Sequence, residues 1–312
     1  MQSYTTTVTH EVRTYLNSLP APTGSQPPIT VFREMLLTAV AGWSKAPAAV
    51  PFISDHIVQA GLHIRIYQMD RSCPQPALLY FHGGGWIRGS IATHDWLCRN
   101  LAVGSGCTIV SVDYRLAPEH VFPAAATDGW TALEWLLAHG PEHDIDTTRL
   151  AVGGDSSGGN IAIATLLQAK ARGISLTAQL LIYPPVDNRM DTGSYQAYAT
   201  GYGLTRAAMA YCWHTYLGDG LQPAPPLAAV LQNDFAGFPP TLIIAAACDP
   251  LRDDGVLLSQ KLAAAGVPVT YSLYEGMIHL FFLMDALFPE ASAAQLEAAA
   301  FLKNRLLSSV NV

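Results

Sequence analysis

The amino-acid sequence predicts a doubly wound α/β fold, in which helices cover both faces of a mostly parallel sheet. Two observations lead to this prediction. Apolar runs of strand length alternate along the chain with segments that repeat apolar residues at helical spacing. The runs are apolar throughout rather than at every second residue, as expected for parallel strands that are buried on both faces. In such a sheet a ligand binds outside the carboxyl ends of the strands.

The strand and helix patterns can be placed along the chain. The first two strand-length runs, 53–58 and 62–67, are separated by Gly61 and indicate a hairpin. The later runs are more continuously apolar and lie at 77–81, 108–113, 150–153, 179–183, 241–247 and 269–274. Helical patterns follow them at 130–137, 161–170, 256–265 and 292–307. Two further helical patches, 10–19 and 31–40, precede the first strand and are separated by prolines.

One long segment interrupts the alternation of strands and helices. Residues 187–225 separate two strands and are rich in aromatic side chains: Tyr195, Tyr198, Tyr202, Tyr211, Trp213 and Tyr216. Long insertions in compact domains are usually functional or disordered, and this aromatic content argues against disorder. We expect the insertion to form a helical cap together with residues 1–50. The cap would lie over one α/β domain made of residues 51–186 and 226–312.

Composition narrows the classes of partner and compartment. The chain has 312 residues, of which half are hydrophobic, so it can bury a large core. Its net charge is -7 and its 17 basic residues form no run, which argues against nucleic acid or an anionic membrane surface as a partner. No apolar run approaches the roughly 18 residues of a membrane helix, and residues 1–19 lack the apolar core of a signal peptide. Five scattered cysteines without metal-binding spacing indicate free thiols, so we expect a cytoplasmic protein with no metal site.

A candidate nucleophile lies where an apolar strand passes into an apolar helix. Ser156 is flanked at the second position on each side by Gly154 and Gly158, which gives the pattern Gly-x-Ser-x-Gly. This pattern is typical of a nucleophile elbow, a strained turn in which only small residues fit beside the serine. The alternative nucleophile, Ser157, would place the carboxylate of Asp155 on the crowded side of the turn. We therefore predict that Ser156 is the nucleophile and that the N–H group of Ser157 stabilises an oxyanion.

A glycine loop directly follows an earlier predicted strand. It reads His82, Gly83, Gly84, Gly85 and Trp86. Consecutive glycines let the backbone approach a ligand closely and point N–H groups at it. In hydrolases with a nucleophile elbow, such a loop completes the oxyanion hole. We expect the N–H groups of Gly83 and Gly84 to donate, with Gly85 as the next candidate, and we interpret His82 as a structural residue.

An acid and a base follow two later strands. Asp249 comes directly after one strand, at the edge where the ligand site is expected, and is the predicted acid. Asp253 and Asp254 instead begin the next helix, where carboxylates stabilise the helix dipole. His279 follows the last strand and is the predicted base, whereas His214 lies in the insertion, before the acid. The resulting order of serine, aspartate and histidine is that of α/β hydrolases.

Four motifs together resemble the hormone-sensitive-lipase family, or family IV, of bacterial carboxylesterases. They lie at 82–86, 113–120, 154–159 and 249–253, and the resemblance covers roughly residues 50–310. The family implies an α/β-hydrolase fold with a helical cap. It also implies a Ser-Asp-His mechanism without a cofactor, acting on small-molecule esters of short to medium acyl chains. By this resemblance the triad is Ser156, Asp249 and His279.

The sequence departs from the family pattern at two positions. Ser157 stands where alanine is usual, and Leu280 stands where glycine is frequent after the histidine. Leu280 would narrow the substrate pocket. Other candidates to line this pocket, with ordinary core packing as the alternative, are Gly85, Trp86, Tyr195, Tyr202, Leu204, Met209 and Trp213.

Several functions remain open on the sequence alone. Hydrolysis of a lactone or amide, or an elimination, uses the same triad. A ligand-binding relative without catalysis is a further alternative, because plant gibberellin receptors resemble this family but lack the catalytic histidine. The presence of His279 argues against that alternative. The sequence does not distinguish a monomer from a homodimer.

Overall fold

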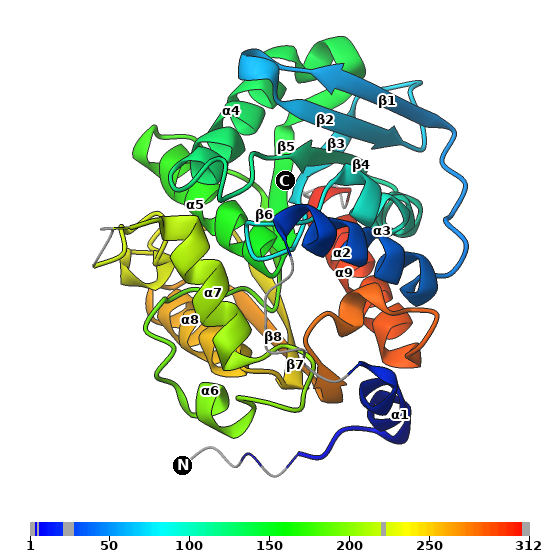
Figure 1. The fold of residues 1–312 in the computed structure, drawn as a ribbon. Helices are drawn as coiled ribbons and strands as arrows, with labels where there is room; N and C mark the ends of the chain where they lie inside the picture. Colours follow the sequence, from blue (N-terminus) through cyan, green and yellow to red (C-terminus); the bar gives the residue numbers. More distant parts are fainter. Residues whose placement is uncertain (1–3, 5, 21–27, 220–222, 308–312) are drawn as a thin grey trace.

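Eight strands of the described residues form one sheet (Figure 1). The computed structural model describes residue 4 and residues 6–20, 28–219 and 223–307. The strands are β1 Phe52–Ile57, β2 His63–Gln68, β3 Gln75–Phe81, β4 Thr108–Asp113, β5 Ile145–Asp155, β6 Ala178–Ile182, β7 Thr241–Cys248 and β8 Val269–Ile278. Their order is β1-β2-β4-β3-β5-β6-β7-β8, antiparallel from β1 to β4 and parallel from there to β8. The predicted α/β fold with a mostly parallel sheet is confirmed.

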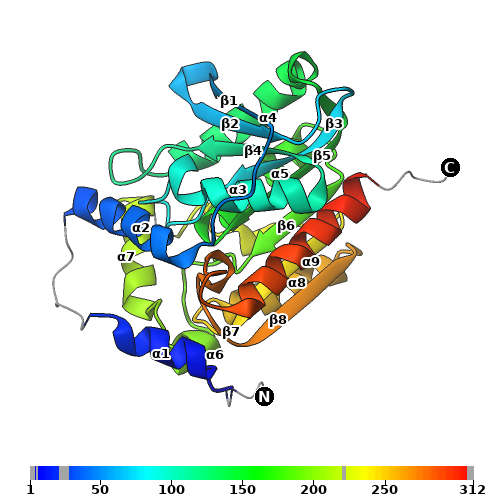
Figure 2. The same ribbon diagram turned by 90° about the vertical axis from the view of Figure 1, so that its right-hand side faces the viewer.

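Helices cover both faces of the sheet (Figure 2). One face carries α3 Ile91–Ser105 and α9 Pro289–Leu306, and the other carries α4 Ala124–His139, α5 Ser157–Ala171 and α8 Arg252–Ala264. Two consecutive residues of β3, Leu78 and Leu79, belong to the two opposite core layers. Both are fully buried, which explains why this strand is apolar on both faces from Ala77 to Phe81.

The last strand is longer than its apolar run predicts, and this places two functional side chains. The run was expected to end at residue 274, but β8 continues to Ile278. Gly276 adopts a φ of 72°, and the pairing of β7 with β8 shifts register before resuming at Cys248 and Ile278. One residue of β7 thus lies opposite three residues of β8, so this bulge adds two residues without ending the strand. The two strands therefore finish level with one another, immediately before Asp249 and His279.

The N-terminal segment and the insertion contain four helices among the described residues. They are α1 His10–Ser18, α2 Ile29–Trp43, α6 Gly193–Ala197 and α7 Arg206–Leu217. The ring of Tyr4 lies edge-on to the ring of Tyr198, with 6.1 Å between centroids. The proline-containing stretch 21–27 and residues 220–222 of the insertion lie outside the described residues.

The remaining features are the short 3₁₀ helices, the state of the cysteines and the length and hydropathy of the helices. The part of the chain that the structure describes contains four 3₁₀ helices, η1 Gln59–Gly61, η2 Gly140–His143, η3 Val230–Gln232 and η4 Phe281–Leu283. All five cysteines are free thiols. Among the helices of the described residues, none has the length and apolar character needed to cross a bilayer.

Candidate active site

Ser156 lies in a tight turn between β5 and α5. Its backbone adopts φ 51° and ψ −123°, a strained conformation for a residue with a side chain. A Cβ atom at Gly158 would collide with the carbonyl oxygens of Phe81 and His82, and one at Gly154 would collide with Phe81 and Gly158. Glycine is thus required at both flanking positions. The crowding comes from the end of β3 as well as from the contact between strand and helix.

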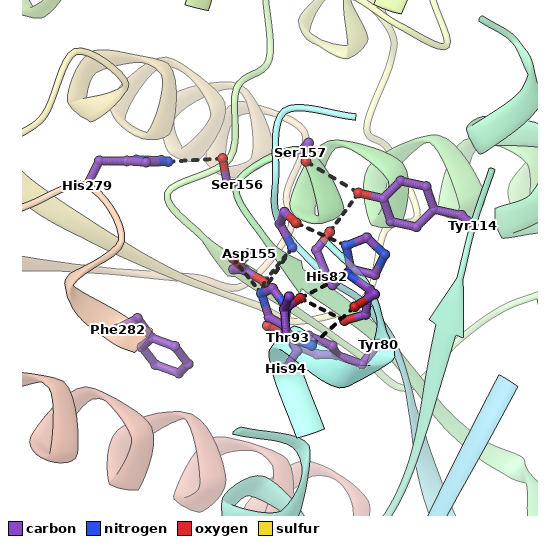
Figure 3. Close-up of polar contacts among 12 residues, drawn as sticks. Tyr80, His82, Thr93, His94, Tyr114, Asp155, Ser156, Ser157, His279 and Phe282 are labelled. Carbon is purple, nitrogen blue, oxygen red and sulfur yellow. Dashed lines mark hydrogen bonds and ion pairs between the residues drawn. The ribbon is translucent and has the colours of Figure 1, made fainter. Parts of the chain in front are cut away.

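Three side chains from three strand ends form a hydrogen-bonded series. His279 Nε2 lies 3.0 Å from Ser156 Oγ, and His279 Nδ1 lies 2.7 Å from Asp249 Oδ2. The second carboxylate oxygen of Asp249 accepts a hydrogen bond from the N–H of Leu251 at 2.9 Å. Asp249 is fully buried and only 4% of His279 is exposed. Figure 3 shows the imidazole of His279 directed at Ser156. With a proton on Nδ1, the Nε2 lone pair faces the serine hydroxyl, as base-assisted attack requires.

The structure corrects one of the expected oxyanion donors. The N–H of Gly83 donates to Asp155 Oδ1 at 2.9 Å, so the expectation that it binds an oxyanion is wrong. Gly84 and Gly85 remain from the three candidates of this loop. They have φ values of 135° and 66°, which residues with a side chain rarely adopt. Ser157 is the first residue of α5, where backbone N–H groups and the helix dipole favour negative charge.

The aspartates at the start of α8 connect distant segments. Asp253 Oδ2 accepts hydrogen bonds from Tyr4 Oη at 2.6 Å and from the N–H of Ser194 at 2.9 Å. Asp254 accepts from the N–H of Val186 at 3.0 Å, and its burial raises its pKa well above the usual range. Stabilisation of the helix dipole was therefore an incomplete explanation for both residues. Neither belongs to the series that ends at Ser156.

The other two histidines considered lie outside this series. His82 is buried, with Nδ1 3.0 Å from the Gly83 carbonyl oxygen and its ring stacked on Tyr114. Burial first, and then the nearby charge of His94, lowers the pKa of His82 to about 3, so it is neutral near pH 7. This agrees with a structural role. The exposed His214 lies 3.9 Å from Asp219 in the insertion.

The comparisons with known proteins agree with this geometry. A family model described as the α/β-hydrolase fold matches residues 78–283. The chain belongs to this α/β-hydrolase family. It is 39% identical over 230 residues to the esterase LipI of Mycobacterium tuberculosis, covering 72% of each chain. It is 36% identical over 255 residues to an ethyl acetate hydrolase of Pseudomonas putida, covering 78% of this chain and 79% of that one. The resemblance to the hormone-sensitive-lipase group is thereby confirmed.

Solved structures of other α/β hydrolases superimpose on nearly the whole chain. A thermostable esterase from Pseudomonas putida matches with a TM-score of 0.90 and 34% identity, covering 96% of this chain and 98% of that one. A hyperthermophilic esterase from Pyrobaculum calidifontis matches with a TM-score of 0.89 and 34% identity, covering 95% and 98% of the two chains.

Several expected pocket residues of this α/β hydrolase are instead core residues. Four of them are at most 2% exposed: Trp86, Tyr195, Met209 and Trp213. The ring of Trp86 stacks on Tyr216, with 4.5 Å between centroids, and lies 4.4 Å from Trp213. Gly85 is covered by Cys212, whose Sγ atom would lie 2.6 Å from an added Cβ. These contacts pack the glycine loop against α7, so core packing accounts for the four side chains better than contact with substrate. Cys212 covers only the side of Gly85 that would carry a Cβ atom, and the backbone N–H of Gly85 remains a candidate oxyanion donor.

Three expected pocket residues keep some exposed surface in the hydrolase. They are Tyr202, Leu204 and Leu280. Leu280 has a φ of 70°, an unusual conformation for a leucine, directly after His279. A glycine at this position would adopt that conformation without strain.

Sequence reasoning missed two groups of residues beside the triad. The ring of Tyr183, which directly follows β6, lies 4.5 Å from the ring of His279, centroid to centroid. The only signal for it was its place at the carboxyl end of a strand. The second group surrounds Asp155. The sequence analysis used Asp155 only to argue against Ser157 as the nucleophile.

Proposed function

We propose that the protein is a serine carboxylesterase that hydrolyses small-molecule esters of short to medium acyl chains. The observation that supports this most directly is the short hydrogen-bonded series from Ser156 through His279 to Asp249. Relatives named as esterases and carboxylesterases support the same reaction class. Nucleophile, base and oxyanion donors all come from the chain itself, so the proposed reaction needs no cofactor. Five free thiols favour a reducing compartment such as the cytoplasm.

The proposed reaction proceeds in two halves. Ser156 Oγ attacks the ester carbonyl carbon while His279 Nε2 takes the hydroxyl proton. Asp249 holds the ring with Nδ1 protonated and stabilises the imidazolium that forms. N–H groups of Gly84, Gly85 and Ser157 stabilise the oxyanion. The alkoxide leaves with the proton from His279, and a water molecule, activated by the same base, then hydrolyses the acyl-enzyme.

The reaction class can be tested with three substrates whose acyl parts all have four carbon atoms. The purified protein is incubated with p-nitrophenyl butyrate, with the corresponding p-nitroanilide and with γ-butyrolactone. We expect rapid release of p-nitrophenol from the ester, and slow or undetectable hydrolysis of the anilide and the lactone. Preferred cleavage of the anilide or the lactone would replace the proposal with an amidase or a lactonase. Specific binding of the ester without turnover would indicate a non-catalytic relative.

We further propose that residues 1–50 and 187–225 form a cap that limits acyl-chain length. The contact of Tyr4 with Tyr198, and the hydrogen bonds that both segments make to Asp253, support a single cap. Each buried methylene adds about 0.8 kcal/mol to transition-state binding until the pocket ends. A longer chain must then displace side chains, which costs about 1–3 kcal/mol.

The cap proposal predicts the dependence of kcat/KM on acyl length. For p-nitrophenyl esters from acetate to palmitate, we expect kcat/KM to rise through short chains, reach a maximum near butyrate to hexanoate, and then fall. Leu280→Gly should move the maximum to longer chains, whereas Leu280→Met, which keeps the volume, should not. Fastest cleavage of palmitate, or a jump in activity at an oil–water interface, would rule out a closed pocket.

A further inference from the structure

A fully buried carboxylate lies on the opposite side of the nucleophile turn from the triad. Asp155 precedes Ser156 at the end of β5, and none of its surface is exposed. Its Oδ1 atom accepts hydrogen bonds from the N–H of Gly83 at 2.9 Å and from Tyr80 Oη at 2.7 Å. His94 Nε2 lies 3.2 Å from the same oxygen. Figure 3 shows Tyr80 and His94 beside Asp155, while Ser156 faces His279.

The surrounding groups hold the carboxylate in its charged form. Burial by itself raises the pKa of Asp155, but the charge of His94 and hydrogen bonds from His94 and Tyr80 outweigh it and leave the pKa below its usual value. His94 Nδ1 is in turn 2.8 Å from Thr93 Oγ1. The Thr93 hydroxyl belongs to the capping box at the start of α3. Asp155 is therefore fixed by groups from β3 and from α3.

The carboxylate links the two parts of the candidate oxyanion hole. The N–H of Gly83 is hydrogen-bonded to Asp155, and Gly84 and Gly85 directly follow Gly83 in the loop. Ser157, the third candidate donor, follows Asp155 by two residues at the start of α5. A Cβ atom at Gly83 would collide with the Asp155 carboxylate, so this contact is close as well as polar. Because this contact is close, the position of the carboxylate restricts where the glycine loop can lie relative to Ser156.

We propose that Asp155, held by Tyr80 and His94, is a positioning residue that fixes the Gly84 and Gly85 N–H groups relative to Ser156. This inference rests on the proposed esterase function and assigns Asp155 no contact with substrate. Oxyanion donors act through their preorganised position, and loss of one donor lowers kcat by about 10²–10³-fold. Displacement of the loop by a fraction of an ångström should have a smaller effect of the same kind.

The test compares two buried aspartates that each accept a backbone N–H. Asp155→Asn keeps the size of the side chain but removes the charge that faces His94. We expect kcat for p-nitrophenyl butyrate to fall roughly 10- to 100-fold, with KM changed less than about threefold. The matched control is Asp128→Asn, because Asp128 is also buried and accepts from the N–H and guanidinium of Arg115. The Asp128→Asn variant should be less stable than the wild type, without a comparable loss of kcat.

A transition-state analogue separates positioning from general loss of structure. A trifluoromethyl ketone with a butyl group forms a tetrahedral adduct with the serine, whose oxyanion occupies the hole. Its inhibition constant should rise by the same factor as kcat falls in Asp155→Asn, and should stay near the wild-type value in Asp128→Asn. Equal kcat values and inhibition constants in the two variants would overturn the inference.

A milder variant keeps the inference testable if Asp155→Asn does not fold. Tyr80→Phe removes a single hydroxyl from the cluster, and circular dichroism and thermal melting establish whether it is folded. A smaller fall of kcat, on the order of threefold to tenfold, with a parallel loss of inhibitor affinity is expected. Unchanged kcat and inhibitor affinity in folded Tyr80→Phe would contradict the proposal. An inactive wild-type protein would instead disprove the esterase function on which the inference rests.

Discussion

We expect Ser156→Ala to abolish ester hydrolysis, with kcat lowered on the order of a million-fold, and Ser157→Ala to retain most activity. The first substitution removes the oxygen that lies 3.0 Å from His279 Nε2. Loss of a triad nucleophile has an effect of this size because the remaining groups cannot form an acyl-enzyme. Ser157 contributes only its backbone N–H to the proposed reaction, and alanine keeps that group. The measurement is steady-state hydrolysis of p-nitrophenyl butyrate.

The two serine variants control for one another. Ser157 is fully buried, and its hydroxyl lies 3.5 Å from Tyr114 Oη, so its loss should affect packing rather than chemistry. Thermal melting of both variants establishes that they are folded. If Ser157→Ala were inactive and Ser156→Ala active, the nucleophile would be wrongly assigned.

We expect Asp249→Asn to lower kcat by about 10⁴-fold with little change in the fold. The carboxylate lies 2.7 Å from His279 Nδ1 and holds the ring in the tautomer that presents a lone pair to Ser156. An amide cannot stabilise the imidazolium, and its NH₂ group favours the wrong tautomer. The kinetic loss should appear in kcat, because substrate binding does not depend on this contact. Single-turnover kinetics with p-nitrophenyl butyrate measures the acylation step directly.

Asp254→Asn is the matched control for the acid. The carboxyl group of Asp254 is buried and accepts a hydrogen bond from one backbone N–H, that of Val186. Burial raises the pKa of Asp254 well above its usual range and so favours the neutral form, which an amide resembles closely. We expect kcat within a few-fold of the wild type. Asp253→Asn should weaken the contacts to Tyr4 and Ser194 and lower stability by about 1–3 kcal/mol. Equal kinetic losses at all three positions would leave the acid unassigned.

The elements that place the triad could be predicted because their signals are local. Glycines on both sides of Ser156 indicate a turn in which strand and helix nearly touch. The apolar runs indicate parallel strands, whose carboxyl ends lie at the same edge of the sheet. The chain order of acid and base then follows from the fold. The extension of β8 could not be predicted, because it depends on a bulge at Gly276 and on pairing with β7.

Contacts between distant segments decided the points that the sequence left open or wrong. The sequence around Gly83 predicts an oxyanion donor because nothing in it indicates that Asp155, 72 residues later, accepts the hydrogen bond of this N–H. Likewise, the sequence leaves Trp86 and Trp213 open between pocket lining and core packing, and their ring contact between the glycine loop and α7 favours core packing. The roles of Asp253 became clear only from Tyr4, 249 residues away. Tertiary partners of this kind override local patterns.

The most direct test of the proposed mechanism is covalent labelling with a p-nitrophenyl alkylphosphonate, a reactive mimic of the tetrahedral intermediate. One equivalent of p-nitrophenol should be released per active chain, and ester hydrolysis should be lost in proportion. Peptide mapping by mass spectrometry should place the phosphonyl group on Ser156, and labelling should be far slower in His279→Ala. A phosphonyl group on Ser157 or another residue, or full ester turnover by a chain labelled at Ser156, would contradict the proposal that Ser156 is the nucleophile.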